Sequence, residues 1–392
     1  MLSKLNRRNW LKSTTLTTAS LAVGTASLFA ATSNNKDISK KIKSWEWENQ
    51  TFNRPKDLWS LKARLLANEN PYGPSPATRL TIMESVSKGN RYGQGDSSKL
   101  AEMIAEKEGV PKEYIMLGPG SSDLLEKTAI THFLEGGNIV SADPAYMSII
   151  KTAKNMKAEW KPIPLTDTWE HDLAGMEAAI DSKTQLVYIC NPNNPTGTIT
   201  NGKALWDFCA RVADKKPVFV DEAYLEFMDP KDQLSMVGLL NKGKNVIISR
   251  TFSKVHGMAG LRVGYIVALP STLEKIQKIT RSNMSMNVTA VRGAMASLGE
   301  TEFIESCRTK NKECREYVCA ELEKLGYTYL PSHTSFVLFP IQVDGKTYLE
   351  KMFDESIGVR SFEVFGKTYC RVSIGTMDEM KLFVEAFKKV MV

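Results

Sequence analysis

The chain has 392 residues, of which 42% are hydrophobic and 24% charged, the composition of a soluble globular protein. That length predicts one large domain with a second, smaller one. The formal net charge is +7, and the first 33 residues hold four basic residues and no acidic one, which leaves +3 for the remainder. The remainder has no basic tract with interleaved aromatic residues, so nucleic acid is excluded as the expected partner.

The six cysteines predict neither a metal site nor a disulfide. They form no CxxC pair and show no His/Cys spacing typical of zinc. Cys307, Cys314 and Cys319 fall in one helical stretch, where residues seven apart are ~10 Å apart at ~1.5 Å per residue. That separation is too long for a disulfide, so we expect free thiols.

The first 33 residues are expected to be an export signal rather than part of the fold. Arg7 and Arg8 precede Trp10, and a stretch rich in Ser, Thr, Ala and Leu follows. This resembles the twin-arginine type of signal, which implies the twin-arginine export machinery as a partner and a periplasmic location. The stretch is too polar to predict a membrane span. Cleavage near Ala31-Thr32-Ser33, an uncleaved anchor and a chance arginine pair in a tail all stay open.

Residues 34–66 are typical of a linker and arm, and short apolar runs then alternate with amphipathic stretches. This alternation predicts an α/β domain over 67–285, with a mostly parallel sheet flanked by helices. The candidate strands are Tyr114–Leu117, Asn138–Ser141, Leu186–Cys190, Val218–Val220, Val246–Ile248 and Gly264–Ala268. A smaller α+β domain is predicted over 286–392. Its expected elements are a long helical stretch over Val291–Leu325, apolar runs at Ser335–Phe339 and Tyr369–Ile374, and a closing helix from Asp378.

One lysine stands where Schiff-base chemistry would need it. Lys254 comes directly after Ser253 and eight residues before Arg262, with an apolar run before it and glycines after it. The amine of lysine becomes nucleophilic once burial or a neighbouring cation lowers its pKa. The segment therefore favours a lysine held beside a bound phosphate, as pyridoxal phosphate requires. Taken alone, the Lys254 segment does not exclude the simpler interpretation, an ordinary strand–loop boundary with surface cations.

Polar residues also follow other predicted strands. The segment Gly118–Asp123 opens a helix, whose free N–H groups favour a phosphate. Tyr146 suits stacking on a flat ring, and Asn194 offers an amide donor from a loop fixed by prolines. Asp221 follows a buried strand and needs a cationic partner such as a protonated pyridine nitrogen. Each feature taken alone also has a simpler interpretation. The segment Gly118–Asp123 could be a helix cap, Tyr146 a core tyrosine, the Asn194 loop a plain turn, and Asp221 a magnesium ligand.

In this order the segments resemble the aspartate-aminotransferase superfamily of pyridoxal-phosphate enzymes (fold type I). Within it they look most like the histidinol-phosphate aminotransferase family. The closer resemblance rests on Asn68–Pro74, Arg91–Gly93, the Asn194 loop, Asp221–Tyr224, the Lys254 segment and Cys370–Thr376. It covers the chain from about Leu66 to the C-terminus. The resemblance implies a large domain with a mostly parallel sheet, a smaller α+β C-terminal domain, and a homodimer with shared active sites.

The resemblance also implies a role for each matching residue. Lys254 forms the Schiff base with pyridoxal phosphate and then moves a proton, and Asp221 pairs with the pyridine nitrogen. Asn194 and Tyr224 hold the ring oxygen, and Tyr146 stacks on the ring. The implied phosphate contacts are Ser121, Ser122, Ser253, Arg262 and, from a second subunit, Tyr92. The implied substrate contacts are Arg371, Arg360 and, from a partner chain, Tyr72.

The expected reaction moves an amino group from an amino acid or a histidinol-phosphate-like amine to a 2-oxo acid. Decarboxylases and C–S lyases share this scaffold and stay open as alternatives. A third alternative is an exported protein that binds the cofactor without turnover. Histidine biosynthesis uses cytoplasmic metabolites, so the export signal favours the broader assignment, aminotransferase, over the narrower one.

Overall fold

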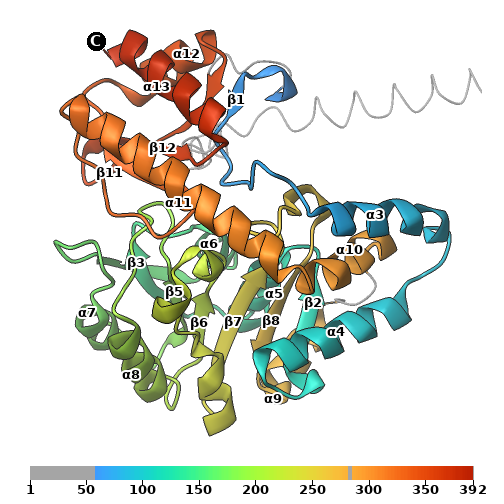
Figure 1. Cartoon of the computed structure of the whole chain (residues 1–392). Coiled ribbons are helices and arrows are strands. Elements are labelled where there is room, and N and C mark those ends of the chain that lie inside the picture. The colour runs from blue at the N-terminus through green and yellow to red at the C-terminus, as the bar shows by residue number, and fades with distance from the viewer. Residues whose placement is uncertain (1–57, 281–284, 392) are drawn as a thin grey trace, which may run out of the picture. The chain divides into compact units, whose positions relative to one another are not determined.

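The computed structural model describes residues 58–280 and 285–391 (Figure 1). The predicted export signal and most of the predicted arm therefore lie outside the described residues. Within the described ranges, no helix combines the length and the apolar character needed to cross a membrane. All six cysteines are free thiols.

A seven-stranded sheet is the larger of the sheets, in the order β2-β8-β7-β6-β5-β3-β4. The pairings from β7 to β4 are parallel, and β8 runs antiparallel to both β2 and β7. The strands are β2 Ile115–Gly118, β3 Asn138–Asp143, β4 Glu159–Pro164, β5 Thr184–Cys190, β6 Val218–Asp221, β7 Val246–Thr251 and β8 Gly264–Ala268. The predicted α/β fold with a mostly parallel sheet flanked by helices is confirmed.

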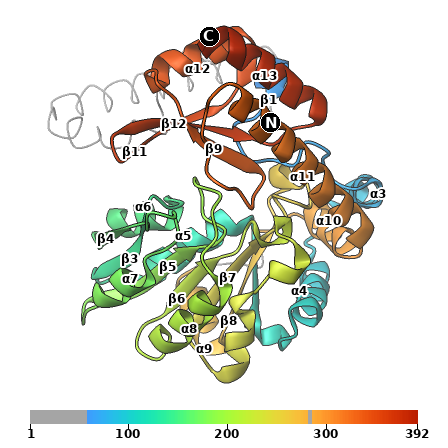
Figure 2. The same ribbon diagram turned by 60° about the vertical axis from the view of Figure 1, so that its left-hand side comes forward.

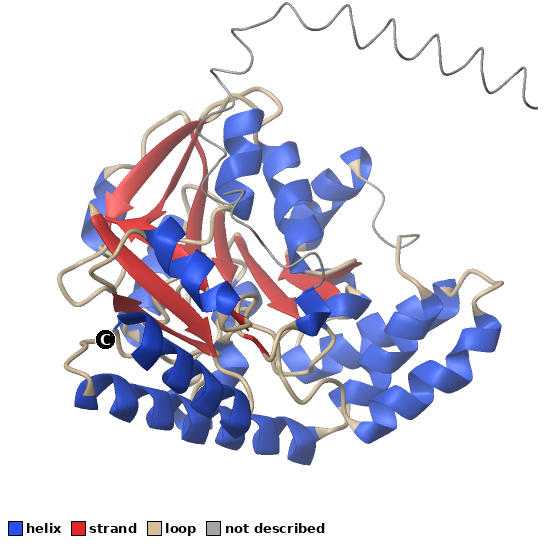
Figure 3. Ribbon diagram, turned by 90° about the horizontal axis from the view of Figure 1, so that it is seen from above, coloured by secondary structure: helices blue, strands red, loops and turns tan. Residues whose placement is uncertain are grey.

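Both faces of this sheet are covered. Val218 and Val220 belong to one buried cluster and Phe219 to another, because successive residues of a strand point to opposite faces. The first cluster includes residues of α4 (Gln94–Glu108), α8 (Gly202–Val212) and α10 (Val288–Leu298). The second includes residues of α5 (Ser121–His132), α6 (Ser148–Asn155) and α9 (Pro270–Ile279). Figure 3 shows the strands with helices around them. Burial on both faces explains why the runs Val218–Val220 and Val246–Ile248 of the central strands are apolar at every position.

A second sheet is built from the C-terminal part of the chain. It has three antiparallel strands in the order β11-β12-β9 (Figure 2). Its strands are β9 Phe336–Pro340, β11 Arg360–Val364 and β12 Lys367–Ser373, and the nearby helices are α11 Thr301–Lys324, α12 Gly345–Asp354 and α13 Met377–Met391. The short strand β1 (Ala63–Arg64) pairs in parallel with β10 (Ile357–Gly358), so the first described residues join this C-terminal part. The remaining α-helices are α3 (Pro76–Ser85) and α7 (Leu173–Ala178).

The structure contains elements that were not predicted, such as β1, β10 and α12, and three further differences have a clear physical reason. The long helical stretch is two helices, because α10 ends at a cap on Gly299 and α11 starts from Glu300. Strand β4 was not predicted, since it contains two prolines and lies at the sheet edge, where proline is tolerated. Strand β11 was missed because its residues are mostly half-buried and polar. The domain boundaries stay predictions, and α10 contributes to the core of the large sheet.

Candidate active site

The side chains predicted to act together lie where parallel strands of the large sheet end. Strand β6 ends at Asp221, β5 ends shortly before Asn194, and β7 ends shortly before Lys254. Because β5, β6 and β7 are parallel neighbours, their carboxyl ends meet at one edge of the sheet. The loops that leave these strands therefore supply one shared site.

Lys254 is partly buried and points its amine at a backbone carbonyl. Its Nζ donates to the oxygen of Ala67 at 3.2 Å and lies 5.6 Å from the ring centroid of Tyr224. Burial, together with the guanidinium of Arg371 and against the carboxylates of Glu69 and Asp221, lowers the pKa of Lys254 to about 8. A neutral amine is thus accessible close to neutral pH, as a nucleophile or a base requires.

Asp221 is a buried carboxylate whose hydrogen bonds are weak. Its side chain accepts from the backbone N–H of Ala223 at 3.3 Å and from the hydroxyl of Tyr188 at 3.5 Å. Bonds of this length offset only part of the desolvation cost. Burial raises the pKa of Asp221 to about 6, although the Ala223 N–H and the Lys254 amine oppose the shift. The carboxylate is therefore ready to accept a cationic or proton-donating partner.

Arg371, on β12, binds a residue of the large sheet. Its NH1 donates to Oδ1 of Asn194 at 2.7 Å, which leaves the amide nitrogen of Asn194 available as a donor. The guanidinium carbon lies 5.2 Å from the ring centroid of Phe336 and 5.0 Å from that of Phe362, within the range of cation–π contacts. The Nε of Arg371 is buried and has no hydrogen-bond partner in the described part of the chain.

A second arginine lies beside the first. Arg360 is directly opposite Arg371 in the register of β11 and β12. Nε of Arg360 and NH2 of Arg371 both donate to the carbonyl oxygen of Leu66, at 3.2 and 3.3 Å. Burial, reinforced by the charge of Arg360, lowers the pKa of Arg371 to about 10. Two neighbouring cations that share one neutral oxygen favour an anion between them.

The start of helix α5 forms a cradle for a second anion. Gly120 precedes the helix with a φ of 86°, and none of the described side chains caps this helix start. The first N–H groups of the helix are therefore free to bind an anion. A Cβ on Gly120 would overlap the guanidinium of Arg262, which also donates to Oγ of Ser253 at 3.3 Å. Arg262 and Ser253 thus lie beside the free N–H groups.

Tyr146 connects this cradle to the rest of the site. Its hydroxyl is 3.4 Å from Oγ of Ser122, and the phenol is close enough to Tyr224 and Arg371 to influence their pKa values. The structure therefore brings together most of the residues that the sequence singled out. They are Lys254, Asp221, Asn194, Tyr224, Tyr146, Ser121, Ser122, Ser253, Arg262, Arg371 and Arg360.

Two residues singled out in the sequence are not part of this group, although Tyr72 packs against the apolar cluster that includes Tyr224 and Phe336. The side chain of Tyr92 is 84% exposed, on the segment before α4. Tyr72 packs against α11, with Nζ of Lys310 4.8 Å from its ring centroid, and burial raises the pKa of its hydroxyl to about 12. The reach of both tyrosines into the site of a second subunit stays a prediction.

The segment Leu66–Asn70, which we call the strap, contacts the site although its sequence predicted no site role for it. Consecutive strap residues bind the site: Leu66 accepts from both arginines, Ala67 accepts from Lys254, and Asn68 donates to Tyr224 at 2.9 Å. Asn70 then donates to the carbonyl oxygen of Val255 at 2.7 Å. The two asparagines of the Asn68-Glu69-Asn70 sequence were the only signal that could have indicated these contacts, since backbone carbonyls leave none.

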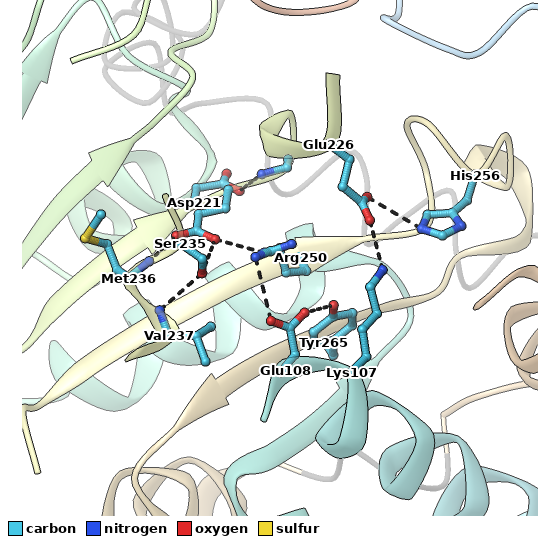
Figure 4. Close-up of polar contacts among 12 residues, drawn as sticks. Lys107, Glu108, Asp221, Glu226, Ser235, Met236, Val237, Arg250, His256 and Tyr265 are labelled. Atoms are coloured by element: carbon cyan, nitrogen blue, oxygen red, sulfur yellow. Dashed lines mark hydrogen bonds and ion pairs between the residues drawn. The ribbon is translucent and has the colours of Figure 1, made fainter. Parts of the chain in front are cut away.

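A buried ionic network lies next to the site (Figure 4). Glu222 follows Asp221 directly and pairs with Nε of Arg250 at 2.9 Å. Glu222 also accepts from Oγ of Ser235 and from the backbone N–H of Met236, each at 2.8 Å. Burial raises the pKa of Glu222, while the positive charge of Arg250 acts in the opposite direction. This network fixes the ends of β6 and β7, the strands that deliver Asp221 and Lys254.

Two further contacts tie helix α4 to this network. Glu108 approaches Arg250 at 3.7 Å and accepts a hydrogen bond from the hydroxyl of Tyr265 at 2.6 Å. Glu226 binds Lys107 at 3.0 Å and lies 3.5 Å from Nε2 of His256 (Figure 4). The end of α4 is thereby held against the strands and loops that carry the site.

The site residues fit pyridoxal phosphate on three observations of this structure. The under-bonded carboxylate of Asp221 suits a protonated pyridine nitrogen. The free amide nitrogen of Asn194 and the hydroxyl of Tyr224 suit the ring oxygen. The uncapped start of α5, beside Arg262, suits the phosphate. Lys254 then supplies the amine for the covalent bond.

Comparison with known proteins agrees with a site for pyridoxal phosphate. The family model for aminotransferase class I and II matches residues 62–387. The chain is 35% identical to a histidinol-phosphate aminotransferase of Moorella thermoacetica, over 84% of this chain and 85% of the relative.

Solved structures of similar fold support this result. The histidinol-phosphate aminotransferase of Sinorhizobium meliloti, solved with pyridoxal-5'-phosphate, is 27% identical with a TM-score of 0.79, covering 88% of this chain and 96% of that one. An L-threonine-O-3-phosphate decarboxylase of Porphyromonas gingivalis shares the fold at 19% identity and a TM-score of 0.72, over 83% of this chain and 98% of the other. The expected cofactor and enzyme class are confirmed: the chain belongs to the class I and II aminotransferases and is a pyridoxal-phosphate-dependent aminotransferase.

Proposed function

We propose that the enzyme takes its amino group from a small donor that carries a phosphate or carboxylate, and passes it to a 2-oxo acid. The observation that carries the proposal is the pair of arginines, Arg371 and Arg360, that lie directly opposite each other in the register of β11 and β12 and both donate to the oxygen of Leu66. An anionic group of the donor would replace this neutral oxygen and gain two charge-assisted contacts. Relatives named for histidinol phosphate support an amino-phosphate as one such donor.

Lys254 has the central role in this proposal. Pyridoxal phosphate, when bound, acts as an electron sink that makes the α-proton of an attached amine acidic. Lys254 would hold the cofactor through its amine, and once a donor has taken that place the amine would take the α-proton of the donor and later return it. Burial lowers the pKa of this amine, which suits it to move a proton near neutral pH. The buried carboxylate of Asp221 would keep the pyridine nitrogen protonated.

The other site residues hold the cofactor in place. Asn194 and Tyr224 donate hydrogen bonds to the ring oxygen, and Tyr146 stacks on the ring. The phosphate is bound at the start of α5, an arrangement that needs no conformational change of the helix. Its proposed ligands are Ser121, Ser122, Ser253 and Arg262.

Single-turnover spectroscopy tests the proposed reaction and donor. Purified enzyme is mixed with histidinol phosphate, with histidinol, and with a panel of amino acids, while the cofactor absorbance is followed. We expect conversion of the cofactor to its amine form, roughly 10- to 100-fold faster per unit concentration for a donor with its anion than for the same donor without it. Equal rates of cofactor conversion with histidinol and with histidinol phosphate would refute the proposal of an amino-phosphate donor.

The same experiment addresses the alternatives that the sequence left open. Release of carbon dioxide, or of pyruvate with sulfide, in place of a keto product would indicate a decarboxylase or C–S lyase. Bound, absorbing cofactor that no donor converts would indicate a binding protein without turnover. Arg360→Gln is the matched variant, because it removes one of the two cations and leaves the bond from Arg371 to Asn194 in place.

We propose a homodimer in which Tyr92 completes the phosphate site of the second subunit. Tyr92 is 84% exposed and follows the exposed residues Leu80, Met83 and Val86 in the chain, and a segment with this many exposed apolar residues is typical of a subunit interface. Mixing the inactive variants Tyr92→Ala and Lys254→Ala should restore up to about a quarter of the wild-type sites, because each mixed dimer contains one intact site. No recovery on mixing, with dimers present, would refute the shared site.

We also propose that the enzyme is exported to the periplasm by the twin-arginine machinery. Arg7 and Arg8 precede a stretch of small and weakly apolar residues, and export of a folded chain agrees with prior loading of a cytoplasmic cofactor. Cell fractionation is the test. The protein should appear in the periplasm, and the double substitution Arg7→Lys/Arg8→Lys should retain it in the cytoplasm. Cytoplasmic protein in both cases would refute export.

A further inference from the structure

Asn68 of the strap is a buried asparagine that bridges the two sheets. It is 2% exposed and has a φ of 55°, a left-handed conformation that asparagine tolerates better than most residues. Its Nδ2 donates to the hydroxyl oxygen of Tyr224 at 2.9 Å. Its Oδ1 accepts from Oγ of Ser373, on β12, at 2.9 Å. Both ends of the side chain are therefore engaged, one on each side of the site.

The backbone of Asn68 favours this polarity. The N–H of Asn68 donates to Oγ of Ser373 at 2.8 Å, so one lone pair of this oxygen is occupied. The hydroxyl proton of Ser373 goes to Oδ1 of Asn68, and Nδ2 then faces Tyr224. A flipped amide would make Oγ of Ser373 accept twice and would take away the acceptor that Oδ1 offers to its proton.

This polarity determines what the hydroxyl of Tyr224 can do. Because its oxygen accepts from Asn68, its own proton is left for a different partner. Burial raises the pKa of Tyr224, so the hydroxyl stays protonated at neutral pH, even though Arg371 and the bond from Asn68 act in the opposite direction. The ring itself is held edge-on to Phe336, with centroids 5.3 Å apart. Tyr224 is thus a positioned donor.

We propose that Asn68 is a positioning residue that aims the hydroxyl proton of Tyr224 at the ring oxygen of the bound cofactor. Ser373 sets the orientation of Asn68, Asn68 sets that of Tyr224, and Tyr224 binds the ring oxygen. The inference rests on the proposed role of Tyr224 and adds two residues to it. It also explains a buried polar group in a strap that otherwise binds the site mostly through carbonyl oxygens.

The test is the pH titration of the absorbance of bound cofactor, which reports the ionisation of the ring and its attached nitrogen without turnover. A donor to the ring oxygen stabilises the anionic form and so lowers the pKa of the chromophore. Tyr224→Phe removes the donor and should raise that pKa by roughly one unit. Asn68→Ala keeps the Tyr224 hydroxyl but removes the bond that orients it, and should raise the pKa of the chromophore by roughly half a unit. Ser373→Ala should shift it in the same direction by less.

A double-mutant cycle distinguishes a specific effect of Asn68 on the orientation of the Tyr224 hydroxyl from a general loosening of the site. In the Tyr224→Phe background, Asn68→Ala should produce no further shift. Asn70→Ala is the matched control: it removes a strap bond of similar length, to Val255, but none to Tyr224, and should leave the titration unchanged. Melting of each cofactor-free variant confirms that it is folded.

Each outcome is decisive. An unchanged titration in Asn68→Ala, equal shifts in Asn68→Ala and Asn70→Ala, or additive shifts in the cycle would each overturn the inference. In all three cases a shift in Tyr224→Phe would leave the proposed function intact. No shift in Tyr224→Phe itself would refute the proposed role of that tyrosine.

Discussion

The buried carboxylate of Asp221 predicts that this enzyme, free of cofactor, becomes more stable when Asp221 is replaced by asparagine. Burial raises the pKa of Asp221 from 3.8 to about 6. The folded state therefore binds the proton more tightly than the unfolded state does. The stability that this proton contributes is fully present below pH ~4 and is lost as the pH rises through about 6.

The size of the effect follows from the shift. Two pKa units at ~1.4 kcal/mol each give roughly 3 kcal/mol, which the charged carboxylate costs the cofactor-free fold near pH 7. The amide introduced by Asp221→Asn cannot ionise but keeps the shape and one acceptor, so the cost disappears. We expect the melting temperature of the cofactor-free variant to exceed that of the wild type by about 5 °C near pH 7 and to match it near pH 4.

The assay is thermal melting followed by tryptophan fluorescence, in matched buffers with and without pyridoxal phosphate. Added cofactor should reverse the order, because the wild-type carboxylate then has a cationic partner and the variant does not. The reasoning is refuted if the cofactor-free variant is less stable at both pH values. A stability difference that does not change with pH would refute it equally, since only the carboxylate titrates in this range at that position.

The site supports three other predictions. Arg250→Met leaves the buried carboxylate of Glu222 without its cation, and should lower the free energy of unfolding by about 3–5 kcal/mol, measured by urea denaturation. Gly120→Ala places a methyl group on the guanidinium at the phosphate cradle, and should weaken cofactor binding roughly 10- to 100-fold in an absorbance titration. Gly136→Ala is its control, because it has a similar positive φ with nothing within 4 Å, and unchanged binding in both would contradict the cradle. Arg371→Lys loses the two-pronged contact, and should raise the KM for the donor roughly 10- to 100-fold with a smaller change in kcat; a change in kcat alone would argue against a binding role.

The central strands and the position of Lys254 beside them could be predicted from sequence because their signals are local. An apolar run that ends in a polar residue indicates a buried strand with a functional end, as at Asp221 and Lys254. The large domain and its mostly parallel sheet follow from the same alternation. Strand β4 could not be found this way, because Pro162 and Pro164 contradict the usual composition of a strand and only its edge position tolerates them.

The contacts of the strap could not be predicted, because they depend on residues distant in the chain. The partners of Asn68 lie 156 and 305 residues away, at Tyr224 and Ser373. Contacts through backbone carbonyls, such as that of Ala67 with Lys254, carry no side-chain signal at all. The pair of Glu222 and Arg250 is likewise set by the alignment of β6 and β7 in the sheet, which composition does not specify.

The separation of 305 residues between Asn68 and Ser373 also constrains the order of events in folding. Closing so long a loop is entropically costly, and contacts distant in sequence form late and slowly. The large sheet can assemble from shorter-range pairings, but the strap cannot settle until β12 is in place to receive it. The site is therefore complete only when the first and the last parts of the described chain have come together, and cofactor binding reports on both at once.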